Sequence, residues 1–223
     1  MKKNVLVCVL FALMIITVKA QAVNDKTDAY RKTINQRAYK IVAALDINDS
    51  ATFYQVRDVI AKQYFDLNDI YALRDSSKKI IKNQFIVDKA ALTDQLTIVE
   101  NKSTKSIDSL HPIYINRLTA LLTKKQIEQI KDGMTFGVLP LTYKAYQDMI
   151  LTLTDAQKSQ ILNWLTEARE HAIDAESSEK KHAWFGKYKG RINNYLSAAG
   201  YDMKKEEEHW QERIKSQKKP AQF

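Results

Sequence analysis

The scarcity of glycine and proline is the feature of this 223-residue sequence that most restricts its fold. No glycine precedes Gly133, and Pro112 is the only proline before Pro140. Tight turns between strands use these residues, because glycine tolerates positive φ angles and proline fixes φ. The first half of the chain therefore favours helices over strands.

Apolar residues recur at three- and four-residue spacing over 30–45, and again in a segment that starts near Ser50. This period places them on one stripe of a helix. A looser pattern predicts a further helix over 78–105, and Pro112 is expected in the first turn of the next helix, where its missing N–H is not needed. We predict an all-α bundle of roughly seven to nine helices.

The motif Leu-Thr-x-x-Gln occurs twice in the second half of the chain. Thr123 is followed by Gln126, and Thr154 by Gln157. In a capping box, the threonine hydroxyl and the glutamine amide satisfy each other's exposed backbone N–H groups. Each motif therefore predicts a helix start. Between the motifs, the glycines and the proline of 133–142 predict one ordered loop.

The N-terminus has the three parts of a secretory signal: a basic start, an apolar run over 5–18, and small residues ending at Ala20. The run is shorter than the roughly 20 residues that cross a bilayer, so we expect cleavage after Ala20 and no integral membrane segment afterwards. The mature protein would be periplasmic or secreted. It would contain no cysteine, because the only one is Cys8.

The expected organisation is a cleaved signal peptide over 1–20, a helical domain over 21–215 and a disordered tail over 216–223. The predicted loop divides the domain into possible packed subdomains, 21–132 and 133–215. The mature chain keeps 32 of its 35 basic residues against 26 acidic ones, a net charge of about +6. This excess suits acidic glycans or anionic surfaces, and the expected compartment argues against nucleic acid.

Residues 180–202 combine aromatic, basic and amide side chains more densely than any other segment. On a helix, four of them share one face: Trp184, Tyr188, Arg191 and Tyr195. A neighbouring face collects apolar residues that are expected in the core: Phe185, Ile192 and Leu196. The glycines Gly186 and Gly190 each cost about 1 kcal/mol inside a helix relative to alanine. Close approach of a backbone or a ligand, or a break in the helix, would offset that cost.

Flat rings stack on pyranose faces, and cations or amides bind hydroxyls and carboxylates. The segment therefore predicts a carbohydrate site, although the same side chains can also cover a helix interface. Trp184 and Tyr188 are expected to stack on the sugar. The full set of candidate contacts is Arg169, His182, Trp184, Lys187, Tyr188, Lys189, Arg191 and Asn194.

The run from Phe185 to Asp202, together with Lys181-His182 and the segment 168–170, resembles the domain-of-unknown-function 3826 family. The resemblance extends over nearly the whole mature chain. It implies an exported, sugar-binding protein of polysaccharide-degrading bacteria, associated with the breakdown of plant cell wall glycans such as pectic material. The family supplies no catalytic residue, so the catalytic residues are unknown.

The sequence leaves open whether the protein is an enzyme. The four histidines, at 111, 171, 182 and 209, lack the i, i+4 spacing of a helical zinc motif, and we expect neither metal nor cofactor. A polysaccharide lyase would use Arg191 or Lys189 against a uronate carboxylate and Tyr188 or His182 as base. A hydrolase would need a pair of carboxylates, for which residues 167, 170 and 174 are available. A third alternative is a periplasmic helical chaperone or interaction protein, whose protein partner the sequence does not specify.

Overall fold

The computed structural model describes residues 27–85 and 87–217. The expected signal peptide, and residues 218–223 of the expected tail, lie outside these ranges. Within them the chain forms eight helices and no strand, so the prediction of an all-α bundle is confirmed. No helix among the described residues is long and apolar enough to cross a membrane.

The chain divides into two compact units, between Phe65 and Asp66. The division lies inside α2 (Ser50–Gln84). In the first unit, a helix over 27–42 precedes the first part of α2. Most of the stripe residues predicted for these helices are buried, including Ile34, Ala38, Val56 and Ile60, whereas Tyr30 is 37% exposed.

The long helices differ from the prediction for the middle of the chain. α2 continues to Gln84, and α3 begins at Lys89 and ends at Thr119, so the predicted single helix over 78–105 is wrong. Phe85, Val87 and Asp88 are not helical, and Asp88 caps α3 by accepting from the Ala91 backbone N–H at 3.0 Å. The prediction of a helix start at Pro112 is also wrong.

Pro112 lies inside α3, where an interior proline costs about 3 kcal/mol or more. The helix continues because its next turns bury Tyr114 and Leu118, which are 1% and 0% exposed. The Ser109 hydroxyl donates to the Lys105 carbonyl of the same helix at 2.8 Å and so caps no new helix. Burial beyond the proline therefore determines where α3 ends.

Both predicted capping boxes are present. Thr123 caps α4 (Lys124–Met134) and Thr154 caps α6 (Asp155–Ile173), each with its glutamine partner bound in return. In the second box the Thr154 N–H donates to Gln157 Oε1 at 2.9 Å, and the Gln157 N–H donates to Thr154 Oγ1 at 3.2 Å.

The predicted loop over 133–142 is much shorter in the structure. Gly133 lies in α4, and Pro140 lies in the first turn of α5 (Val138–Met149), where proline is tolerated. Only residues 135–137 interrupt the helices, and Gly137 supplies a positive φ of 66° at the N-cap of α5.

α7 (Ser178–Ala198) ends as predicted at Gly200, whose φ is 98°. The Gly200 N–H donates to the Ser197 carbonyl at 3.0 Å and the Tyr201 N–H to the Leu196 carbonyl at 3.1 Å. This is a Schellman ending, which satisfies carbonyls that the helix leaves unpaired. The last helix, α8, spans Met203–Gln217.

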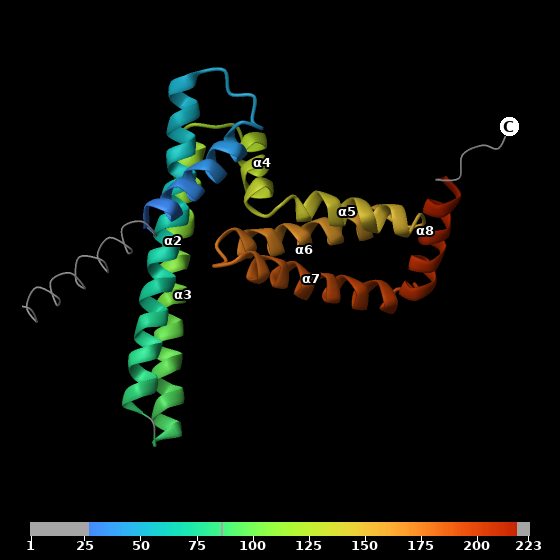
Figure 1. Cartoon of the computed structure of the whole chain (residues 1–223). Helices are drawn as coiled ribbons and strands as arrows, with labels where there is room; N and C mark the ends of the chain where they lie inside the picture. Colours follow the sequence, from blue (N-terminus) through green and yellow to red (C-terminus); the bar gives the residue numbers. More distant parts are fainter. Residues whose placement is uncertain (1–26, 86, 218–223) are drawn as a thin grey trace, which may run out of the picture. The chain divides into compact units, whose positions relative to one another are not determined.

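The core of the second unit lies between α5, α6 and α7, which run side by side while α8 crosses their end (Figure 1). Its buried residues come from all three helices and from the α5–α6 turn: Leu139, Tyr146, Ile150, Leu153, Ile161, Leu165, Ala168, Ala172, Phe185, Tyr188, Ile192 and Leu196. The three residues predicted for the core face of α7 are all among them. This packing fixes which faces of α6 and α7 remain at the surface.

Candidate functional site

A polar cleft of about 600 Å³ opens between the second part of α2, α3, the C-terminal end of α6 and the start of α7. Its polar and aromatic lining residues are Tyr71, Arg74, Glu100, Asp108, His111, Glu170, His171, Asp174, Glu176, Lys180 and Trp184. The volume lies within the range of small-molecule sites, roughly 300–1,000 Å³. We call this hollow the polar cleft.

His111 is held between two carboxylates of α6. Its Nδ1 donates to Asp174 Oδ2 at 2.5 Å, and its Nε2 lies 3.7 Å from Glu170 Oε2. The hydrogen bond to Asp174 raises the pKa of His111 above 6.5, against the opposing effect of partial burial. Since Nδ1 is occupied, Nε2 is the ring nitrogen left to interact with a ligand.

Asp174 occupies a position that disfavours a carboxylate. It is the C-cap of α6 and is buried, so its charge faces the negative end of the helix dipole. His111 offsets this charge, and the buried Lys181 ammonium donates to the Ala172 and Ile173 carbonyls, each at 2.9 Å. The end of α6 is thus contacted by the His111 imidazole from α3 and by the Lys181 ammonium from α7.

α2 contributes Tyr71 and Arg74 to the polar cleft. The Tyr71 hydroxyl donates to the Asp174 backbone carbonyl at 2.7 Å, and burial raises the pKa of Tyr71 to about 12. Arg74 stacks over the Tyr71 ring, with Cζ 4.7 Å from its centroid, and pairs with Glu176. Both residues hold the turn between α6 and α7 in place.

Behind the polar cleft, an ionic network joins α6 to α4. Both oxygens of Glu170 accept from the Lys131 ammonium, at 3.0 and 2.9 Å. Arg169 is 2% exposed and pairs with Glu128 and with Asp132, the latter at 2.6 Å. The structure therefore places Arg169, a predicted carbohydrate contact, in an interface with α4.

A strip of rings and cations continues from the polar cleft along α6 and α7. We call it the aromatic strip: Trp164, His171, Trp184, Lys187, Arg191 and Tyr195. His171 and Trp184 stack with centroids 4.3 Å apart, and Trp164 meets Tyr195 edge to face at 5.2 Å. Because His171 and Trp184 also line the polar cleft, the two surfaces are continuous.

Cations lie over the rings of the aromatic strip. The Lys187 ammonium is 5.0 Å from the Trp184 centroid, and the Arg191 guanidinium carbon is 4.9 Å from that of Trp164. Arg191 Nη1 also lies 3.8 Å from Glu167 Oε2. The two side chains are 56% and 50% exposed, and ion pairs between such exposed groups contribute little to stability. These cations can therefore exchange their contacts for a ligand.

The structure brings only part of the predicted set together. Trp184, Lys187 and Arg191 share the aromatic strip, whereas Tyr188 is 4% exposed and lies in the core. Burial, with a hydrogen bond to Glu167, raises the pKa of Tyr188 to about 12.

The other predicted contacts lie elsewhere on α7. His182 stacks on Phe136 of the α4–α5 turn, with ring centroids 5.7 Å apart. Lys189 lines a hollow formed with α5 and α8, and Asn194 is exposed. α7 runs unbroken through Gly186 and Gly190, and nothing lies within 4 Å of a Cβ built at either glycine. Neither a helix break nor a close backbone thus explains these glycines.

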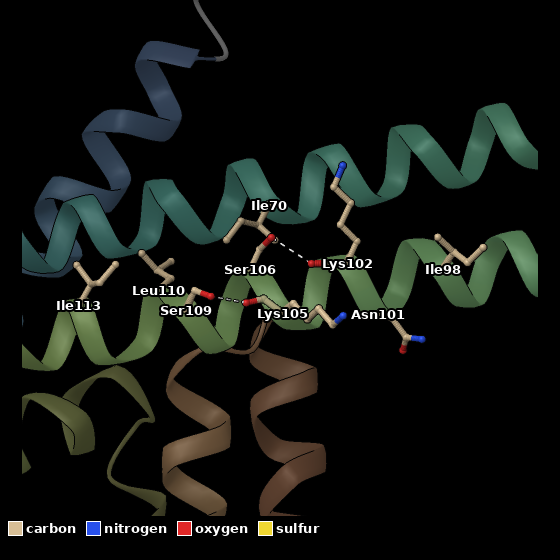
Figure 2. Close-up of a pocket in the computed structure, with 9 residues that line it drawn as sticks. All are labelled: Ile70, Ile98, Asn101, Lys102, Lys105, Ser106, Ser109, Leu110 and Ile113. Carbon is tan, nitrogen blue, oxygen red and sulfur yellow. Dashed lines mark hydrogen bonds between the residues drawn. The ribbon is translucent and has the colours of Figure 1, made fainter.

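A shallow groove runs between α2 and α3, with a volume of about 820 Å³ (Figure 2). Ile70, Ile98, Leu110 and Ile113 line it, together with polar side chains of α3. The Ser106 and Ser109 hydroxyls both donate to carbonyls of α3 itself, so they can accept a hydrogen bond from a ligand but not donate one. The groove therefore offers less chemistry than the polar cleft.

The described residues contain no group of three or more histidine, cysteine or acidic side chains arranged to hold a metal ion. His111, Glu170 and Asp174, the nearest approach to such a group, are engaged with one another and with Lys131. The polar cleft can accept and donate hydrogen bonds, and His111 can transfer a proton.

The fold and the site define an all-α protein with a polar cleft that continues into an aromatic, basic strip. The chain belongs to a family described as "Protein of unknown function (DUF3826)", which matches residues 31–216. The match confirms the resemblance seen in residues 168–202 and includes every residue of the polar cleft. A comparison with curated proteins found no match.

Proposed function

We propose that this is an exported carbohydrate-binding protein, in which a glycan lies on the aromatic strip and extends into the polar cleft. The observation that carries the proposal is the stacked pair His171–Trp184, which belongs to both surfaces. His171 supports one face of the Trp184 ring and fixes its orientation. A fixed indole beside a cleft lined with donors and acceptors is the arrangement that recognises a pyranose.

The cation above Trp184 does not prevent sugar stacking. Lys187 is exposed, and an exposed cation–π contact is worth only about 0.5–1 kcal/mol. A sugar ring can replace the ammonium on the indole face, after which Lys187 binds a hydroxyl or a carboxylate at the ring edge. Lys187 and Arg191 on the aromatic strip, with Lys180 in the adjoining polar cleft, favour an acidic glycan on the strip.

The compartment and the glycan class are part of the proposal. The basic start, apolar run and Ala20 of the N-terminus support export to the periplasm or the exterior. The family resemblance and the basic strip support an acidic glycan of the plant cell wall type, in polysaccharide utilisation.

The test is calorimetry of residues 21–223 against uronate-containing and neutral oligosaccharides. We expect saturable binding of the uronate oligomers that weakens with salt, because surface charge attraction is screened. Trp184→Ala with Arg191→Ala should weaken it at least about tenfold, a loss of about 1.4 kcal/mol.

The matched control is His182→Ala with Lys189→Ala, because His182 stacks on Phe136 and Lys189 lines a different hollow. This variant should bind as the unchanged protein does. Circular dichroism must show that both variants are folded. If no oligosaccharide binds, or if both variants lose binding equally, the proposal fails.

A lyase is the second candidate, and His111 is the observation that favours it. The sequence suggested Tyr188 or His182 as base, but Tyr188 is buried and His182 lies beside Phe136. In β-elimination, His111 Nε2 would take the C5 proton of a uronate, the C4–O bond would break to form a C4=C5 double bond, and water would protonate the leaving oxygen.

A uronate polymer should then yield products absorbing in the ultraviolet, with a rate that rises as His111 deprotonates. His111→Gln should abolish the rate, and an absence of such products with every uronate polymer would exclude this activity.

A further inference from the structure

A third hollow, of about 630 Å³, lies between α5, α7 and α8, away from the aromatic strip. We call it the apolar groove. Leu141, Met149, Met203 and Trp210 form its apolar surface, and Lys189 and Lys204 lie among its polar residues. None of these six residues lines the polar cleft or belongs to the aromatic strip.

The apolar side of the groove is partly open to solvent. Leu141 is 68% exposed, Trp210 is partly buried, and Met149 and Met203 are partly buried against the core. A single exposed apolar residue is ordinary, but here four apolar side chains that all keep some exposure line one hollow. Methionine adapts its shape to an apolar ligand more readily than branched side chains do. The groove therefore suits a flexible hydrocarbon body.

The frame around the groove is fixed. Arg213 of α8 donates to the Asp148 and Met149 carbonyls at the end of α5, each at 2.9 Å. The Tyr146 hydroxyl donates to Asn193 Oδ1 at 2.7 Å, which joins α5 to α7. Both contacts hold the groove in shape before any ligand arrives, which lowers the ordering cost of binding.

The polar side of the groove favours an anion. Lys189 and Lys204 supply two ammonium groups, against the single carboxylate of Glu207. Lys204 lies 3.9 Å from Glu208, but these side chains are 86% and 59% exposed, so the pair is weak. Asn193 accepts from Tyr146 through its oxygen, so its amide nitrogen can donate to a ligand.

We propose that the apolar groove binds an amphiphilic carboxylate of the fatty-acid type. The hydrocarbon chain lies over Leu141, Met149, Met203 and Trp210, and the carboxylate binds Lys189, Lys204 and the Asn193 amide. The two lysines are the reason for proposing a negatively charged ligand. The partly exposed apolar lining is the reason for proposing a hydrocarbon chain. This site uses no residue of the aromatic strip and is independent of the proposed carbohydrate function.

The probe is dodecanoate below its micelle concentration, titrated into residues 21–223 by calorimetry and by tryptophan fluorescence. We expect saturable, one-to-one binding. Dodecyltrimethylammonium carries the same chain with the opposite charge and should bind at least about tenfold more weakly, since it lacks the charge-assisted hydrogen bonds.

Two variants separate the chain contact from the charge contact. Leu141→Glu should abolish dodecanoate binding, whereas Lys189→Gln with Lys204→Gln should weaken dodecanoate at least about tenfold and leave the ammonium amphiphile unchanged or tighter. The matched control, Lys124→Gln with Lys125→Gln, removes two exposed lysines of α4 that do not line the apolar groove, and it should leave dodecanoate binding unchanged. Thermal unfolding confirms that each variant is folded.

Three results would overturn the inference. Dodecanoate fails to bind, or both amphiphiles bind equally well, or the Lys189 and Lys204 variant binds dodecanoate as the unchanged protein does. In the second and third cases the groove takes apolar chains without selecting an anion.

Discussion

Replacing Arg169 by methionine tests whether this residue serves the fold or a ligand. Methionine keeps an unbranched apolar side chain and removes the guanidinium from its contacts with Asp132 and Glu128. Hydrogen bonds to charged groups contribute about 1.5–3 kcal/mol each, so the gross loss is about 3–6 kcal/mol.

Two features of the structure reduce that loss. The side chains of Asp132 and Glu128 are 28% and 40% exposed, so both carboxylates can regain water. The buried Nε of Arg169 has no hydrogen-bond partner, and removing it relieves a cost of about 1–3 kcal/mol. We expect a net destabilisation of about 2 kcal/mol, which lowers Tm by about 4–8 °C in a chain of this length.

Thermal and urea unfolding of residues 21–223, followed by circular dichroism, measure this change. Arg191→Met is the matched control, because Arg191 is exposed on the aromatic strip and its loss should change stability by less than about 0.5 kcal/mol. If Arg169→Met unfolds like the unchanged protein yet loses glycan binding, Arg169 contacts the ligand as the sequence predicted, and the structural role argued for it is refuted.

Two further predictions concern the pH response and α7. Because its folded pKa is raised above 6.5, His111 stabilises the fold fully below that value, and this contribution is lost as pH rises through the folded pKa. Urea unfolding across this range should thus show the advantage over His111→Gln shrinking with pH; a pH-independent difference would refute the pairing with Asp174. Gly190→Ala should raise stability by about 0.5–1 kcal/mol, since its Cβ would enter open space on a continuous helix. If Gly190→Ala destabilised the unliganded protein, the continuous helix at this position would be contradicted. If the variant were more stable but no longer bound the glycan, Gly190 would be needed for ligand binding.

The sequence predicted those parts of the fold that depend on neighbours three or four residues apart. The capping boxes at Thr123 and Thr154 and the ending at Gly200 are local hydrogen-bond patterns, and all three are present. The segment between α2 and α3 contains neither glycine nor proline, and the N-cap residue Asp88 is its one sequence signal for a new helix. Pro112 predicted a helix start where there is none, because burial of residues beyond it keeps α3 helical.

The assignment of Tyr188 shows that the spacing of residues on a helix cannot always decide which face they occupy. Tyr188 follows Phe185 by three residues and precedes Ile192 by four, so the spacing alone was compatible with the core face as well as with the face of Trp184. The structure resolves this choice, because α6 covers the Tyr188 side of α7. Trp184, one hundred degrees around the helix from Phe185, stays at the rim of the polar cleft.

The polar cleft has no comparable local signal. His111 and Asp174 are 63 residues apart in sequence, and Tyr71 reaches Asp174 across 103 residues. Glu170 and Asp174, four residues apart, resembled an ordinary solvated face of a helix. Only the packing of α2 and α3 against the end of α6 turns these residues into a site.

The charges around the polar cleft are difficult to explain by stability alone. Asp174 is buried at the negative end of α6, where His111 of α3 binds its carboxylate and the Lys181 ammonium of α7 binds the last carbonyls of the helix. Buried ion pairs of this kind can often be replaced by apolar residues of similar volume without loss of stability. A helical bundle could close its α6–α7 turn with such residues, yet this chain surrounds the turn with His111, Glu170 and Arg74 beside an open hollow. Titratable groups that shift one another's pKa within a cleft are typical of sites that bind or transform a ligand, and this argues that the cluster is kept for function.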